Sequence, residues 1–264
     1  MKGDVVLAKS LSLPLAGLLL GVLLSGCVTT GLPERKEIDL DKAVKTHVQL
    51  GLRYLQSGEN RDIARYHFNK ALELGKRNPD AHHGLAMLYQ ADGELDVAED
   101  HFRKALRYGD DFSMAQTNYG VFLYRQARYE EALEQFEEAS QDLTYKRRSY
   151  ALTNYGRAAV KLGKTEEAEK AFIRALALND SLPQPLLELA EIKYEAGAYA
   201  QAKQYLDLYS DKHRQVPQSL WLGIRIEKIF GNRDKERSYA LALRNLYPYS
   251  AEALEYKKMM ANDG

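Results

Sequence analysis

Apolar and polar residues recur at helical spacing along the chain, and the pattern is clearest between Ala115 and Ala139. Small residues stand at Gly120, Ala132 and Ala139, with bulky apolar residues between them. Small residues let two helix backbones approach closely, while large side chains fill the space beside them. The stretch therefore predicts two amphipathic helices folded back on each other. Such a pair needs similar pairs on both sides to bury its apolar face.

The same arrangement recurs 34 residues upstream (from 86 to 120), 36 residues downstream (from 120 to 156) and 34 residues further on (from 156 to 190). The matching sets are Ala86, Ala98, Phe102 and Ala105; Gly120, Ala132, Phe136 and Ala139; Gly156, Ala168, Phe172 and Ala175; and Ala190, Ala202, Leu206 and Tyr209. A period of about 34 residues with this small–large pairing is the signature of the tetratricopeptide repeat (TPR). The sequence therefore predicts an all-α TPR solenoid of about six helix-turn-helix repeats.

The turns between paired helices give a second, independent register. Glycine accepts the left-handed conformation that ends a helix. It stands at this place in five repeats, and the third repeat has Ala127 instead. The glycines are Gly58, Gly93, Gly163, Gly197 and Gly231. Ser113, followed by Gln116, predicts a capping box at the start of the third repeat.

The repeats are predicted to span residues 44–248, with Val44 near the start of the first. A longer loop, Ser140–Arg148, separates the third and fourth repeats. The sixth repeat departs from the pattern, because Ile224 and Glu236 replace small residues. Residues 249–264 predict a C-terminal capping helix and tail, and Ser250 is expected to cap that helix.

Residues 1–26 predict a lipoprotein signal peptide. A basic start precedes an apolar run, Leu11–Leu24, that is too short for a comfortable membrane span. The run ends in Leu24-Ser25-Gly26-Cys27, which resembles the bacterial lipobox. That resemblance implies cleavage before Cys27, the only cysteine of the chain, and attachment of diacylglycerol to its thiol. Residues 27–43 would then be a lipidated tether.

By the same resemblance the mature N-terminus carries three acyl chains, which hold a protein firmly on a membrane. Val28 follows the cysteine where an inner-membrane retention signal would have aspartate. We therefore expect the protein on the periplasmic face of the outer membrane. The alternative is an unmodified, buried thiol at Cys27.

Composition and motifs exclude several classes of function. Lys and Arg equal Asp and Glu at 37 each, so we expect no nucleic-acid partner. The sequence has no glycine-rich phosphate loop, no nucleophile elbow and no zinc-spaced His/Cys set. We expect no enzyme, cofactor, metal site or small-molecule substrate. His82 and His83 are adjacent and diverge around a helix, and His67 and His101 share one repeat position, which indicates a structural role.

The candidate site is a protein-binding groove. In TPR arrays the first helix of each repeat lines the concave surface, and nine residues at its inward positions in the second, third and fourth repeats are the candidates. They are Met87, Asn118, Val121, Tyr124, Arg125, Tyr150, Asn154, Arg157 and Lys161. Asn118 and Asn154 share one repeat position, where an exposed amide would hold a peptide backbone through a donor and an acceptor. Alternatively, these asparagines bond helices within the array.

Arg125, Arg157 and Lys161 would favour an acidic group on the partner. The lysine–asparagine clamp with which chaperone-type TPR proteins hold C-terminal carboxylates is not reproduced.

Two segments resemble one TPR family more closely than the general repeat. They are Thr117–Ser149, with its ASQD loop, and Ser219–Ser250, with LGIR and LYP motifs. Both resemble the PilF/PilW family of type IV pilus biogenesis lipoproteins, over about Val44 to Ser250. The resemblance implies six repeats, outer-membrane anchoring, and a role in localising and assembling the type IV pilus secretin, a PilQ-like protein. A general periplasmic TPR adaptor, which scaffolds peptidoglycan hydrolases or outer-membrane protein assembly, is the alternative; an enzyme is the least favoured.

Overall fold

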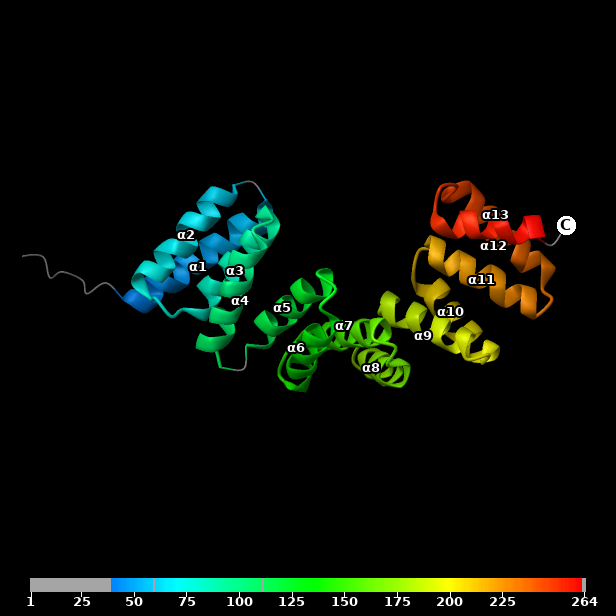
Figure 1. The fold of residues 1–264 in the computed structure, drawn as a ribbon, viewed down its shortest axis with the longest axis horizontal. Coiled ribbons are helices and arrows are strands. Elements are labelled where there is room, and N and C mark those ends of the chain that lie inside the picture. Colours follow the sequence, from blue (N-terminus) through cyan, green and yellow to red (C-terminus); the bar gives the residue numbers. More distant parts are fainter. Residues whose placement is uncertain (1–38, 59, 111, 263–264) are drawn as a thin grey trace, which may run out of the picture. The chain divides into compact units, whose positions relative to one another are not determined.

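A computed structural model describes residues 39–58, 60–110 and 112–262, which belong to one compact unit. This part of the chain contains thirteen α-helices and no strand (Figure 1). The predicted signal peptide, Cys27 and most of the predicted tether lie outside the described residues. Within the described ranges no helix combines the length and apolar character needed to cross a membrane.

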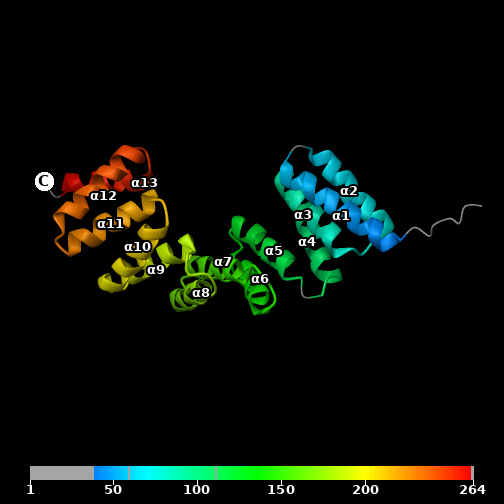
Figure 2. The same ribbon diagram turned by 180° about the vertical axis from the view of Figure 1, so that it is seen from behind.

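Twelve of the helices form six antiparallel pairs, and the thirteenth packs against the last pair (Figures 1 and 2). The pairs are α1 (Leu40–Ser57) with α2 (Arg61–Leu74), α3 (Pro79–Asp92) with α4 (Leu95–Tyr108), α5 (Ser113–Arg125) with α6 (Tyr129–Gln141), α7 (Arg148–Lys161) with α8 (Thr165–Leu178), α9 (Pro183–Glu195) with α10 (Tyr199–Lys212), and α11 (Pro217–Ile229) with α12 (Arg233–Leu246). The last helix is α13 (Ala251–Asn262). The predicted all-α TPR solenoid is confirmed.

Helix starts follow capping chemistry in several repeats. Asp39 accepts a hydrogen bond from the Lys42 backbone amide, so α1 begins at Leu40, one turn before Val44. Asn78 caps α3 in the same way, with proline at the first helical position. The Ser250 hydroxyl accepts from the Ala253 amide at 3.1 Å, which confirms the expected cap of α13.

The predicted capping box at the third repeat is wrong. Ser113 is the first helical residue of α5 rather than the cap, and its hydroxyl donates to Asp142 Oδ2 at 2.6 Å. Gln116 donates to Glu138 Oε2 at 2.8 Å. Both side chains therefore reach the second helix of the pair and the loop after it, where Asp142 also accepts from the Thr144 amide and hydroxyl.

The first helices form the inner row of the array. The first helices of adjacent pairs contact each other at α1–α3, α3–α5, α5–α7 and α9–α11, and α13 continues this row on α11. Among the described residues no two second helices make a comparable contact. The residues on the exposed side of the first helices therefore face a common surface, which we call the inner face.

The core depends on phenylalanines that lie flat against glycines. A Cβ atom built on Gly120 would lie 2.6 Å from Cε1 of Phe136, and one on Gly156 would lie 2.5 Å from Cε1 of Phe172. Both phenylalanines are completely buried. The small–large spacing found in the sequence is therefore the contact that sets the distance between paired helices.

We expect Gly120→Leu to lower the free energy of unfolding by about 1–3 kcal/mol or more, because the added side chain overpacks the space that Phe136 fills. Chemical denaturation monitored by circular dichroism measures this loss. Arg125→Ala, at an exposed position of the same helix, is the control and should lower stability far less. Equal losses from the two variants would show that the repeat register is misplaced.

In the sixth repeat the large residue of the contact lies on the first helix and the small residue on the second, the reverse of the other repeats. Ile224 takes the place of the small residue on the first helix, and Ala240 takes the place of the phenylalanine on the second. Both are buried in one cluster. Gly223, one position earlier, lies against the ring of Tyr239, which a Cβ would approach to 2.8 Å. The repeat therefore departs from the sequence pattern without losing close helix contact.

The turn of the third repeat contains a strained residue. Ala127 has φ 59°, in the left-handed region, and is the only non-glycine residue of the described chain with positive φ. The glycines at the equivalent turns have φ between 67° and 82°. Alanine pays a steric cost of about 1–2 kcal/mol in this conformation.

We expect Ala127→Gly to raise the free energy of unfolding by about 1 kcal/mol, because glycine adopts this conformation without the Cβ clash. Gly197→Ala is the matched reverse change: Gly197 has φ 72° and open space around it, so only the backbone conformation opposes a methyl group. It should lose a similar amount in the same denaturation experiment. A loss of stability in Ala127→Gly would contradict the assigned strain.

Candidate protein-binding face

The structure places the predicted groove residues on first helices, but with unequal exposure. Arg125, Tyr150 and Lys161 are exposed, whereas Met87, Asn118, Val121, Tyr124 and Arg157 are half-buried and Asn154 is buried. Arg125 and Lys161 form no ion pair with any described residue, so both can meet an acidic group. Their role in binding stays a prediction.

Tyr124 and Arg157 are brought together across two repeats. The Arg157 guanidinium lies 4.9 Å from the centre of the Tyr124 ring, a cation–π contact between α5 and α7. The same ring packs edge-on against Tyr129 at 5.1 Å. Arg157 is therefore partly used in holding adjacent repeats together, and only its remaining N–H groups can serve a partner.

Asn118 bonds to the preceding repeat rather than to solvent. Its Nδ2 donates to His83 Nε2 at 2.8 Å and lies 3.6 Å from the sulfur of Met87. Burial lowers the pKa of His83 to about 4, so the ring is neutral at pH 7 and accepts through Nε2. The donor of the Asn118 amide is thus occupied within the array, as the alternative interpretation held.

The expectation of an exposed amide is wrong at Asn154, which is 4% exposed. Its Nδ2 donates to the Tyr150 carbonyl oxygen at 3.0 Å in its own helix, and its Oδ1 accepts from Arg157 at 3.3 Å. The cause lies in the preceding repeat, where Thr117 holds the position that His83 holds one repeat earlier. Thr117 is fully buried and donates to the Ser113 carbonyl oxygen, so it presents no ring nitrogen to accept from Asn154.

Two histidine pairs occupy equivalent places in the first two repeats. His47 and His67 approach through their Nδ1 atoms at 2.9 Å, and His82 and His101 do so at 3.0 Å. Each pair joins the two helices of its repeat, which supports the structural role expected for His67 and His101. Within the described ranges no group of three or more histidine, cysteine or acidic residues could hold a metal ion.

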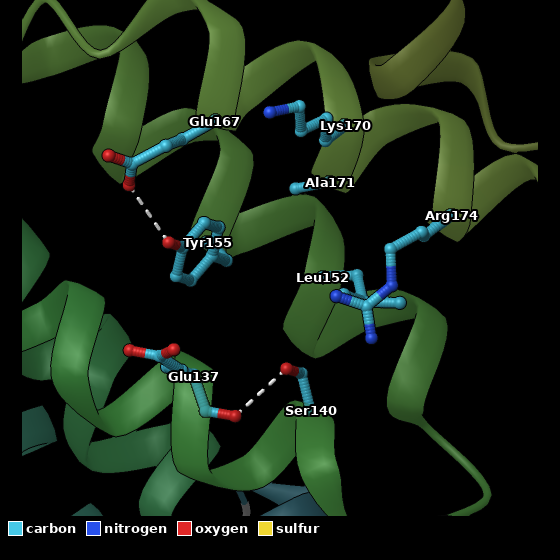
Figure 3. A pocket seen from close by; sticks show the side chains of 8 residues that line it. All are labelled: Glu137, Ser140, Leu152, Tyr155, Glu167, Lys170, Ala171 and Arg174. Atoms are coloured by element: carbon cyan, nitrogen blue, oxygen red, sulfur yellow. Dashed lines mark hydrogen bonds between the residues drawn. The ribbon is translucent and has the colours of Figure 1, made fainter.

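A small pocket lies between α6, α7 and α8 (Figure 3). Tyr155 donates there to Glu167 Oε2 at 3.0 Å, and burial first, then this bond, raises the pKa of Tyr155 to about 12. Figure 3 shows Arg174 extending from α8 beside Leu152. At about 160 Å³ the pocket is smaller than ordinary ligand sites and carries both acidic and basic side chains. We assign it no binding role.

A larger pocket on the inner face was missed by the sequence analysis. It has a volume of about 640 Å³ and lies between α9, α11 and α13. We call it the C-terminal pocket; its lining includes Tyr194, Trp221, Arg225, Lys228, Lys258 and Met259. Trp221, Arg225 and Lys228 occupy the same repeat positions as Thr117, Val121 and Tyr124. Extending the inward positions to the sixth repeat would have found them.

Comparisons with known proteins agree with the repeat fold. Two tetratricopeptide-repeat family models match residues 48–107 and 154–218, and residues 111–181. The chain is thus a TPR protein, a class whose members bind protein partners.

The relatives narrow the class. The chain is 41% identical over 241 residues to "Type IV pilus assembly protein PilF" of Pseudomonas aeruginosa. The aligned region covers 90% of this chain and 95% of that protein. It therefore belongs to the PilF family of type IV pilus assembly proteins. A solved structure of P. aeruginosa PilF matches with a TM-score of 0.78 at 40% identity, covering 83% of this chain and 99% of that one. A structure of PilW, described as a widely conserved type IV pilus biogenesis factor, matches with a TM-score of 0.69 at 30% identity, covering 81% and 98%.

Proposed function

We propose that this chain is a non-enzymatic lipoprotein of the outer membrane that binds the type IV pilus secretin and supports its localisation and assembly. The observation that carries the proposal is the 41% identity to a type IV pilus assembly protein over nearly the whole chain. The lipobox ending at Cys27 supplies the anchor, and the inner face supplies a surface for a protein partner.

The anchor and the binding surface have separate tasks in this proposal. Acyl chains on Cys27 hold the repeats at the periplasmic face of the outer membrane. The exposed cations Arg125 and Lys161, together with the exposed ring of Tyr150, contact the partner on the inner face. Acidic groups on the partner would complement these cations.

Cys27→Ser tests the anchor. We expect this variant to leave the outer membrane and the secretin multimers to be depleted from the outer-membrane fraction, because serine has no thiol to acylate. Val28→Ala, which keeps the cysteine, is the control and should fractionate like the unaltered protein. Normal secretin multimers in the outer membrane of the Cys27→Ser strain would refute the proposed mechanism.

Co-purification from detergent-solubilised membranes tests the partner. Recovery of the secretin with the full-length chain supports the proposal. Recovery of peptidoglycan hydrolases and no secretin would instead assign the chain to the general adaptor class.

A further inference from the structure

The inner face across α5 and α7 carries positive charge that no acidic residue of these two helices offsets. Neither helix contains aspartate or glutamate. Their cations on the inner face are Arg125 on α5 and Arg157 and Lys161 on α7. The remaining cation, Arg148, donates to the Ser140 carbonyl oxygen at 2.6 Å, in the loop before α7. We call the part of the inner face formed by Arg125, Arg157 and Lys161 the cationic surface.

The acidic residues of the neighbouring first helices are engaged elsewhere. On α9, Glu191 pairs with Arg225 at 2.5 Å, and Glu195 lies 3.9 Å from the same guanidinium. Glu188 accepts a hydrogen bond within its own helix at 2.6 Å. On α3, Asp92 pairs with two arginines of α2 at 2.7 and 2.9 Å. Among the described residues none of these carboxylates forms an ion pair with the cationic surface, which is left to meet acidic groups from outside the chain.

The spacing of the two exposed cations, Arg125 and Lys161, matches the repeat of a polyproline II helix. They occupy the same repeat position, 36 residues apart, on two first helices that contact each other. Helices in contact have axes about 8–10 Å apart. A polyproline II segment rises about 3.1 Å per residue with three residues per turn, so its side chains at positions i and i+3 lie on one side, about 9 Å apart. A β-strand places same-side side chains about 7 Å apart, which fits less well.

Each exposed cation has an apolar neighbour. Tyr124 precedes Arg125 in α5 and is half-buried. The Arg157 guanidinium lies 4.9 Å from the centre of the Tyr124 ring, which holds the ring in place. Val160 occupies the equivalent position beside Lys161 on α7 and is 37% exposed. Proline-rich segments in the polyproline II conformation dock on aromatic-lined surfaces, so these neighbours suit the proline rings of such a segment.

We propose that the cationic surface binds a proline-containing protein segment in the polyproline II conformation, with acidic residues at positions i and i+3. One carboxylate meets Arg125 and the other meets Lys161, while the proline rings between them pack against Tyr124 and Val160. Prolines fix this conformation before binding, so less conformational entropy is lost on binding. The inference rests on the proposed function as a protein-binding scaffold and names the kind of segment that the partner presents.

Isothermal titration calorimetry with two isomeric peptides tests the spacing. Full-length acylated protein in phosphatidylcholine nanodiscs is titrated with acetyl-Pro-Asp-Pro-Pro-Asp-Pro-amide, whose aspartates are three positions apart, and with acetyl-Pro-Asp-Pro-Asp-Pro-Pro-amide, whose aspartates are two positions apart. The two peptides have the same composition and charge. We expect the first to bind about fivefold or more tightly, because only its carboxylates lie on one side at the spacing of Arg125 and Lys161.

Two charge-matched double variants locate the binding. Arg125→Gln, Lys161→Gln removes the exposed cations of the cationic surface and should weaken binding of the first peptide about tenfold or more. Arg107→Gln, Arg174→Gln removes two exposed cations from the second helices α4 and α8 and should bind that peptide like the unaltered protein. Circular dichroism melting shows whether both variants fold.

Equal affinity for the two isomers would show that net charge alone attracts the peptide and would overturn the proposal, as would the absence of binding up to millimolar peptide. An equal loss of affinity in both double variants would exclude the cationic surface as the site. Secretin depletion in the Cys27→Ser strain, without selectivity between the peptides, would leave the proposed function standing and refute this inference. Selective binding as expected, with normal secretin in that strain, would refute the proposed function and leave this inference standing.

Discussion

Lys203→Met is expected to lower the free energy of unfolding by about 3–5 kcal/mol, because it leaves a buried carboxylate without its counter-charge. Glu227 on α11 is only 2% exposed, and its Oε1 accepts a hydrogen bond from the Lys203 ammonium on α10. The other carboxylate oxygen of Glu227 is buried without a hydrogen-bond partner. Loss of the ammonium therefore leaves the negative charge of Glu227 buried and unpaired between the fifth and sixth repeats. Urea denaturation at pH 7 measures the loss.

Two further variants make the test specific. The double variant Lys203→Met, Glu227→Leu removes both charges and should recover most of the lost stability, since apolar replacements of buried ion pairs are often neutral or stabilising. Lys258→Met makes the same substitution in the exposed pair with Glu255 and should have a much smaller effect. If Lys203→Met cost no more than Lys258→Met, the pair would not behave as buried.

Lowering the pH from 7 to 5 is expected to destabilise the protein by about 2 kcal/mol through His83 alone. Burial holds the pKa of His83 at about 4 in the folded state, below the ordinary histidine value of 6.5. Between these two values the unfolded chain binds a proton that the folded chain does not. The stabilisation from neutral His83 is therefore complete above pH 6.5 and falls progressively toward pH 4.

Other groups near the N-terminal repeats modify this slope. Burial, with a smaller effect from His82, lowers the pKa of His101 to about 4, which adds to the loss in acid. Burial raises the pKa of Asp80, which acts in the opposite direction, since protonation then favours the folded state.

His83→Gln isolates the contribution of His83, because glutamine still offers an acceptor to Asn118 but does not titrate in this range. Urea denaturation of both proteins at pH 7, 6 and 5 should show a shallower dependence on pH in the variant. The same slope in both proteins would exclude His83 as the source.

Repeat geometry was predictable because it depends on residue size at fixed spacing. The contact of Gly120 with Phe136 follows from the sizes of the two residues at the repeat spacing. The turn register identified Ala127 as the one departure from glycine, and its φ of 59° shows that it adopts the left-handed conformation of the equivalent glycines. A close approach of two helices tolerates few residue types, so the sequence pattern reveals where the helices approach. The structure confirms the predicted solenoid.

Side-chain partners across repeats were not predictable in this way. Asn118 and Asn154 share a repeat position, yet Asn118 bonds to His83 and Asn154 bonds to its own helix. The difference arises because the preceding repeat places a histidine against Asn118 and a threonine, Thr117, at the equivalent position before Asn154. The C-terminal pocket depends on α13 as well as on the sixth repeat, so no single repeat contains its pattern. The exposed residues Arg125 and Lys161 remain predicted binding residues on position and charge.

Among the described residues each helix pair contacts only the pairs beside it, so the helices at the two ends of the described array have a packed neighbour on one side only. The largest cluster of buried apolar side chains lies between α3 and α9. We therefore expect amide hydrogens in that middle region to exchange with solvent most slowly, and fraying to begin at α1 and α13 and move inward.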